Sequence, residues 1–205
     1  MAGRSDVKAV TITADTVAAD DDGISANASV GNNAALTIGG ALADGGSVTL
    51  SHARKITVTS AGDDSSKSFT IVGTDVNGDS QTESLTGANA GVATSTNYFL
   101  TIASITAVGN PAGNVKAGIS ADAADVIFAG RTRLKGAFLS STATAGTIDF
   151  LNTSPVGTSE FKLRSIASAT ATRDVTIPME GVLFDSGLFI QYTVSTFLLM
   201  TVFHA

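Results

Sequence analysis

Short runs of alternating polar and apolar residues dominate the chain from about residue 33 to residue 119. They are rich in Val, Ile, Thr and Phe, and Gly, Asn or Asp separates them at the spacing typical of a β-sandwich. In KITVTS, Ile56 and Val58 are expected on one strand face, and Thr57 and Thr59 on the other. Helical periodicity is absent, so we predict an all-β fold. The predicted strand runs are AALTIGG, GSVTLS, RKITVTS, KSFTIVGTD, DSQTESLTG, NYFLTIASITAVG and NVKAGIS.

A second β-rich block follows residues 120–130, which we expect to form a connection. Its strand-like runs are RTRLKGAFLSS, GTIDFLN, SEFKLRSIA, RDVTIPMEG, VLFDSGLFIQYTV and TFLLMTVFHA. The last run has apolar residues on both alternating faces, which indicates a strand covered from two sides. We therefore expect Phe197, Leu199, Met200 and Val202 to form a subunit interface or the core supporting it. A homo-oligomer is the predicted result.

The domain prediction is two small β-sandwich or jelly-roll-like domains, residues 29–120 and 126–205, preceded by an extended N-terminal arm. This arm, residues 1–28, is acidic and poor in large apolar side chains. Docking of the arm on another protein and fraying in solvent both fit this composition. If the arm only docks, its deletion should leave both β-domains folded.

Composition removes several functional classes. The 205 residues include no Cys, which excludes disulfides and thiolate catalysis, and only two His, His52 and His204. A net charge of −6 argues against nucleic acid as a partner. The first residues hold no apolar run typical of a signal peptide, and the apolar tail is interrupted by polar residues. We therefore expect no membrane association, synthesis in a cytoplasm, and no cofactor.

The stretch FTIVGTDVNGDSQTESLT allows two interpretations. Asp75, Asn77, Asp79 and Glu83 place four oxygen-bearing side chains close together, as a calcium loop does. However, Gly78 is out of position for such a loop and no helix flanks it. Asn77-Gly78 between alternating residues instead predicts a β-hairpin with a type I′ turn.

Other candidate sites have simpler interpretations. Asp20, Asp21 and Asp22 are expected to be solvated, because alternate side chains of an extended chain diverge. GDD at residues 62–64 predicts a turn and GGALADGG a hairpin loop without phosphate-binding features. His52 is expected in a surface turn at a strand boundary and not as a general base. No catalytic residue and no metal ligand is predicted.

The basic run RTRLKG puts Arg131, Arg133 and Lys135 on one strand face by their period of two. No aromatic residues interleave with them, as they would in a surface that binds single-stranded nucleic acid. A solvated face or a contact with an acidic partner is the expected role.

The stretches TSAGDD, FTIVGTDVNG, QTESLTG and AGNV are similar to one β-rich module of the virion proteins of tailed bacteriophages, and the resemblance covers roughly residues 50–205. The tail GVLFDSGLFIQYTVSTFLLMTVFHA is similar to a second module, in which Tyr is usual where Phe189 and His204 stand here.

The resemblance implies a structural role without catalytic residues. We expect a capsid decoration (cement) protein that binds the major capsid protein or other virion proteins, most plausibly as a trimer. A neck, tail or fibre-associated subunit is the first alternative. A carbohydrate-binding attachment module is the second, although the chain has no Trp and only Tyr98 and Tyr192.

Overall fold

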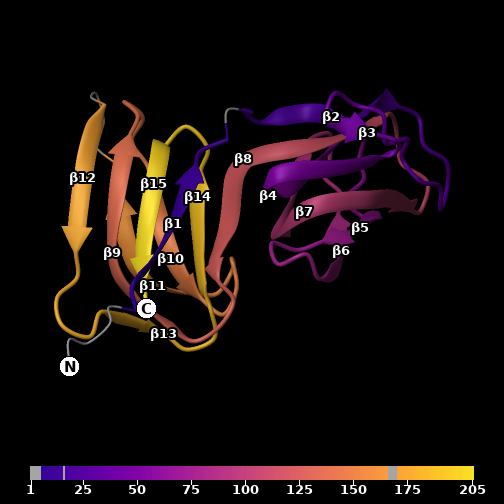
Figure 1. The fold of residues 1–205 in the computed structure, drawn as a ribbon. Coiled ribbons are helices and arrows are strands. Elements are labelled where there is room, and N and C mark those ends of the chain that lie inside the picture. Colours follow the sequence, from indigo (N-terminus) through magenta and orange to yellow (C-terminus); the bar gives the residue numbers. More distant parts are fainter. Residues whose placement is uncertain (1–5, 16, 166–169) are drawn as a thin grey trace. The chain divides into compact units, whose positions relative to one another are not determined.

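The computed structural model describes residues 6–15, 17–165 and 170–205, and this part of the chain is all-β, without a helix. None of the described residues belongs to a helix that could cross a bilayer. The chain divides into two compact units. We call Val17–Ala123 the continuous unit, and Met1–Thr16 together with Ala124–Ala205 the discontinuous unit (Figure 1).

The continuous unit is built on one antiparallel sheet with the strand order β2–β8–β4–β7–β5–β6, to which β3 adds beside β4. The long strands β4 and β7 shift register twice along their pairing, which lets the sheet coil over its core. Ile56, Phe69, Phe99 and Ile102 are fully buried there. The strands are β2 Asp20–Ala28, β3 Ala43–Asp44, β4 Ser47–Ser60, β5 Ser68–Thr74, β6 Ser80–Thr86, β7 Val92–Val108 and β8 Val115–Phe128.

Side chains bind β6, the last strand of this sheet, back to β7. The Glu83 carboxylate accepts hydrogen bonds from the backbone N–H groups of Thr96 (2.7 Å) and Asn97 (3.0 Å). Gln81 donates from Nε2 to the Tyr98 carbonyl at 2.9 Å. These contacts satisfy three backbone groups of β7 and tie β6 to that strand.

A buried arginine anchors the start of the continuous unit. Arg54 on β4 has no exposed surface, and its guanidinium donates to the carbonyls of Val17, Ala18 and Ser120. Arg54 and Ile56 are two residues apart on β4, so strand alternation places both side chains on the same, inward-facing side. Burial of a charge without hydrogen-bond acceptors costs free energy. The three carbonyls around Arg54 offset this cost.

The discontinuous unit is made of two antiparallel sheets. One has the order β1–β15–β9–β12, with β13 also beside β9, and the other has β11–β10–β14 and the end of β8. Tyr192 on β14 contacts Phe197 on β15, with ring centroids 4.7 Å apart, so the two sheets pack face to face. The strands are β1 Lys8–Thr13, β9 Thr132–Ser141, β10 Thr147–Asn152, β11 Thr158–Arg164, β12 Ala171–Thr176, β13 Val182–Phe184, β14 Leu188–Thr193 and β15 Phe197–His204.

The predicted arm differs from what the structure shows. Residues of β1 pair along β15, from Lys8 opposite His204 to Thr13 opposite Leu199, and Ile12 is buried. Residues of β2 pair with β8. The alternation in KAVTIT therefore marks a strand of the discontinuous unit, because a sheet elsewhere in the chain supplies the partner that a lone strand lacks.

Two strand boundaries also need correction. GSVTLS and RKITVTS are parts of one strand, β4, so His52 lies within a strand and not in a turn. Residues 120–128 continue β8 and do not form a connection. Small residues, mainly Ala, Ser and Asp, weaken the apolar signal in both places, but the backbone pairing of a sheet does not require large side chains.

Candidate functional site

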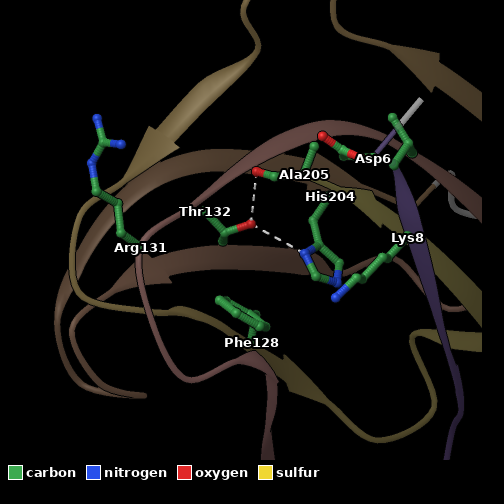
Figure 2. A pocket seen from close by; sticks show the side chains of 8 residues that line it. Asp6, Lys8, Phe128, Arg131, Thr132, His204 and Ala205 are labelled. Atoms are coloured by element: carbon green, nitrogen blue, oxygen red, sulfur yellow. Dashed lines mark hydrogen bonds between the residues drawn. The ribbon is translucent and has the colours of Figure 1, made fainter. Parts of the chain in front are cut away.

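The main candidate site is a pocket of about 470 Å³ in the discontinuous unit, which we call the His204 pocket. Phe128 at the end of β8 and Thr132 at the start of β9 line it, and Figure 2 shows the Phe128 ring below Thr132 and His204. His204 on β15 and Lys8 on β1 face each other there, since the two residues are paired in the sheet. The other lining residues are Asp6, Val7, Arg131 and Ala205.

His204 is held on two sides. Its Nδ1 lies 3.1 Å from the Thr132 hydroxyl, and its ring packs on Phe128 with centroids 5.3 Å apart. The Thr132 hydroxyl also donates to the Ala205 carbonyl at 3.1 Å. Because the hydroxyl directs its one proton at this carbonyl, its oxygen suits the tautomer of His204 that has a proton on Nδ1.

This geometry argues against nucleophilic catalysis by the pair. A general base would need to accept the hydroxyl proton, whereas Thr132 gives its proton to the Ala205 carbonyl. Burial lowers the pKa of His204 below its usual range, and the charge of Lys8 lowers it further. The pocket therefore presents a neutral imidazole beside an apolar ring and the Lys8 ammonium.

The hairpin interpretation of residues 69–86 is confirmed, with a different turn. β5 and β6 pair from Ser68 opposite Thr86 to Thr74 opposite Ser80. Gly78 has φ +87° and donates to the Asp75 carbonyl, but Asn77 does not have a positive φ. This is a type I turn followed by a left-handed glycine, a common three-residue loop.

The carboxylates of this stretch serve the backbone. Asp75 Oδ1 accepts from the N–H groups of Asn77 (2.8 Å) and Asp79 (2.9 Å), which fixes the turn. Glu83 binds β7 as described above. The two-residue turn with positive φ at both positions occurs instead in GGALADGG, at Gly45 and Gly46 between β3 and β4. That stretch is therefore a hairpin loop, as predicted.

The turn predicted at residues 62–64 is also present. Asp63 Oδ1 accepts from the backbone N–H and the hydroxyl of Ser65, and these bonds hold the pKa of Asp63 below its usual range. Asp64 is buried and accepts from the Ala112 N–H at 2.7 Å. Both carboxylates stabilise loops of the continuous unit.

The three successive aspartates differ from the prediction. Asp20, Asp21 and Asp22 each place one carboxylate oxygen within 4.8 Å of the others, because the register of β2 shifts between Asp20 and Ser25. The prediction that these three side chains diverge is therefore wrong. The Lys116 ammonium binds Asp21, which raises the pKa of Lys116 and offsets part of the negative charge.

The basic run on β9 finds its acidic groups within the same chain. Arg131 lies 3.6 Å from Asp185, and Arg133 lies 3.9 Å from the Glu180 carboxylate. Lys135 donates to the carbonyls of Met179 (3.2 Å) and Glu180 (3.0 Å). The cluster therefore holds the segments on either side of β13, a role that the period of two could not reveal.

The predicted interface residues lie mostly inside. Phe197, Met200 and Val202 are buried between the sheets, so they belong to the supporting core and are not surface residues. Leu199 is half-buried on the outer face, and a register shift near it leaves Leu198 53% exposed. Both faces of β15 are apolar because its inner face is core and its outer face is partly covered.

Sequence reasoning missed the His204–Thr132 pair and the exposed Met179. The pair joins residues 72 positions apart, and no local pattern indicates it. Comparison with known proteins gives no further guide, because no family model, curated protein or solved structure matches this chain.

Proposed function

We propose that this chain is a non-enzymatic structural component of a tailed-bacteriophage virion that binds the outer surface of the head and stabilises it. In this proposal it is a capsid decoration (cement) protein, assembled in the bacterial cytoplasm, whose partner is the major capsid protein. The support is the resemblance of residues 50–205 to two phage virion modules, together with a chain built from strands. Such modules provide stiffness without a cofactor.

The observation that carries the proposal is that strands of the discontinuous unit, β11 and β12 among them, keep open sheet edges. Among the described residues, β12 pairs only with β9, and β11 pairs only with β10. β12 is mostly exposed, and its Arg173 and Asp174 project into solvent. Unpaired N–H and C=O groups on such edges can accept a strand from another protein, which is a common way for protein surfaces to join.

The polar groups of the candidate motifs also favour a scaffold over an enzyme. Glu83, Asp64 and Asp75 bind backbone N–H groups of the chain, and Thr132 donates to a carbonyl. A reactive carboxylate or hydroxyl must instead be directed at a substrate. Here these groups determine the shape of loops and of the sheet edge.

A neck, tail or fibre-associated subunit remains the second candidate, since the same modules suit any virion position. The carbohydrate-binding alternative is weaker, because Tyr98 and Tyr192 are each only 2% exposed. Neither ring can offer a flat platform to a sugar.

The test is binding of the full chain to heads that lack it. Purified protein should sediment with such heads and saturate at a fixed ratio to the major capsid protein, and it should not sediment with isolated tails. Binding to tails alone would support the second candidate, and binding to neither would overturn both.

A further inference from the structure

A second pocket lies in the continuous unit, where the chain enters β2. Its volume is about 660 Å³, and all of its described lining residues belong to this unit. Asp20 and Asp21 are the charged residues of that lining, and Thr57 lines it from β4. We call it the Asp20 pocket. Its chemistry is therefore that of a polar hollow with negative charge.

Three carboxylates come together beside this pocket. One oxygen each from Asp20, Asp21 and Asp22 lies within 4.8 Å of the other two. Two oxygens bound to the same Ca²⁺ are at most about 5.2 Å apart, because each Ca–O bond is about 2.3–2.6 Å long. The spacing of the three oxygens therefore fits a single ion. The Lys116 ammonium balances one of the three negative charges, and the remaining two are what a divalent cation balances.

The backbone of β2 holds these carboxylates in place. Asp20 Oδ1 accepts a hydrogen bond from the Asp22 N–H at 3.2 Å. A Cβ at position 23 would lie 2.6 Å from Asp20 Oδ2, so Gly23 leaves space for the carboxylate. A Cβ at position 118 would lie 1.9 Å from the Asp20 carbonyl oxygen, so Gly118 lets β2 lie directly against β8. The oxygens are thus close together before an ion binds, which lowers the entropic cost of binding.

An independent observation in the Asp20 pocket also indicates a ligand. Thr57 lies between the core residues Ile56 and Val58 on β4, and its side chain is on the other face of the strand, where it lines the pocket. Thr57 is only 8% exposed, and its hydroxyl has no hydrogen-bond partner among the described residues. A buried hydroxyl without a partner costs free energy, so such groups usually bind an ordered water or an ion.

We propose that the Asp20 pocket binds one Ca²⁺. The carboxylates of Asp20, Asp21 and Asp22 ligate the ion, the Lys116 ammonium leaves Asp21, and a water bound to the ion donates a hydrogen bond to Thr57 Oγ1. Ca²⁺ is favoured over Mg²⁺, because three neighbouring carboxylates suit its flexible coordination, whereas Mg²⁺ demands a near-ideal octahedron. The ion would link β2 to β4 and stabilise that edge of the sheet. This inference is independent of the role in a phage head.

Isothermal titration calorimetry of the full chain with CaCl₂ tests the site. We expect one ion per chain with a Kd of about 10⁻⁴ to 10⁻³ M, which is weak for Ca²⁺ because Lys116 competes for Asp21. Asp20→Asn and Asp22→Asn should each weaken binding about tenfold. Asp79→Asn is the control, since it removes the same charge from the exposed turn between β5 and β6. Wild-type affinity in Asp20→Asn, or no binding at about 10 mM Ca²⁺, would overturn the proposal.

Two further variants distinguish a defined site from diffuse attraction of cations. Lys116→Met removes the competing ammonium and should tighten Ca²⁺ binding about fivefold, whereas Lys67→Met, with the same change in charge, should not. Thr57→Val removes the hydroxyl at constant charge and should weaken binding about threefold. Mg²⁺ should bind about tenfold more weakly than Ca²⁺. Equal affinities for the two ions, with unchanged Ca²⁺ binding in Thr57→Val, would overturn the proposal.

Hydrogen exchange of the wild-type chain gives a result even if an Asn variant fails to fold. At free Ca²⁺ ten times above Kd, amides of β2 that exchange through opening of the site should slow about tenfold. Amides of β11, in the other unit, should be unaffected. Exchange in β2 that is the same with and without Ca²⁺ would contradict the site.

Discussion

The two units treat the last strands of their sheets differently. In the continuous unit, the side chains of Glu83 and Gln81 on β6 bind backbone groups of β7, so they tie this last strand to the sheet. In the discontinuous unit, β12 and β11 each keep an unpaired side among the described residues. Unpaired edges invite association. The comparison indicates that side chains tie β6 to its sheet in the continuous unit, whereas β11 and β12 keep edges at which another strand could pair.

The largest expected effect comes from deleting residues 1–13. The deletion removes β1 and the buried Ile12 and leaves β15 unpaired on one side, which should cost the discontinuous unit about 4 kcal/mol. The continuous unit should be unaffected. Hydrogen exchange followed by mass spectrometry reports each unit separately. Unchanged hydrogen exchange in β15 would instead support an N-terminal arm that the fold does not need. Lys8→Ala, which keeps β1, is the control.

Arg54→Met should destabilise the continuous unit by about 3 kcal/mol, because it leaves the carbonyls of Val17, Ala18 and Ser120 buried without their donor. The matched control is Lys55→Met, which loses only a contact 5.2 Å from the Tyr98 ring and should cost about 0.5 kcal/mol. Denaturation in urea measures both. Equal effects would contradict an anchoring role for Arg54.

Glu83→Ala removes two of the hydrogen bonds that tie β6 to β7. Loss of two charge-assisted hydrogen bonds to β7 should cost about 2 kcal/mol and increase exchange at Thr96 and Asn97. Glu160→Ala removes the same charge from an exposed position of β11 and should cost less than about 0.5 kcal/mol. If Glu83→Ala kept wild-type protection from hydrogen exchange at Thr96 and Asn97, a role of Glu83 in tying β6 to β7 would be contradicted.

The turn between β5 and β6 gives a smaller effect. Gly78→Ala should cost about 1 kcal/mol because of its positive φ, whereas Asn77→Ala should cost clearly less. In a type I′ turn both residues need a positive φ, so both substitutions would lower the free energy of unfolding. Thermal unfolding of the two variants therefore distinguishes the observed turn from the predicted one.

The smallest effect is a pH dependence of the discontinuous unit. Burial lowers the pKa of His204 below its usual 6.5, so between the two values the unfolded chain binds a proton that the folded chain does not. Stability should then rise with pH across this window and fall as pH drops below about 6.5. Urea midpoints at several pH values measure it. His204→Gln should flatten the curve.

Sequence reasoning succeeded where the information is local. The alternation of Ile56 and Val58 with Thr residues, the hairpin at Asp75–Asp79 and the loop at Gly45-Gly46 all follow from neighbouring residues. It failed for β1, because its partner β15 lies at the other end of the chain. The pairing of distant strands depends on which edges remain free, and no local pattern contains that information.

The candidate site was less accessible to sequence reasoning. The sequence marks His204 as one of two His and as a departure from an aromatic position, but its contacts with Thr132 and Phe128 require the folded sheet. For the acidic triplet, the expectation of diverging side chains assumed a regular strand, whereas the shift in β2 brings the oxygens together. Irregularities of this kind arise from tertiary packing.

The central claim is that the chain is a structural subunit of the phage head. Counting its copies in purified virions, by mass spectrometry with isotope-labelled reference peptides, tests this most directly. We predict copies on the order of hundreds per particle, in a fixed ratio to the major capsid protein, as expected of a subunit that repeats with the capsid symmetry. Absence from the particle, or a number that fills only a single ring at the neck or tail, would contradict it.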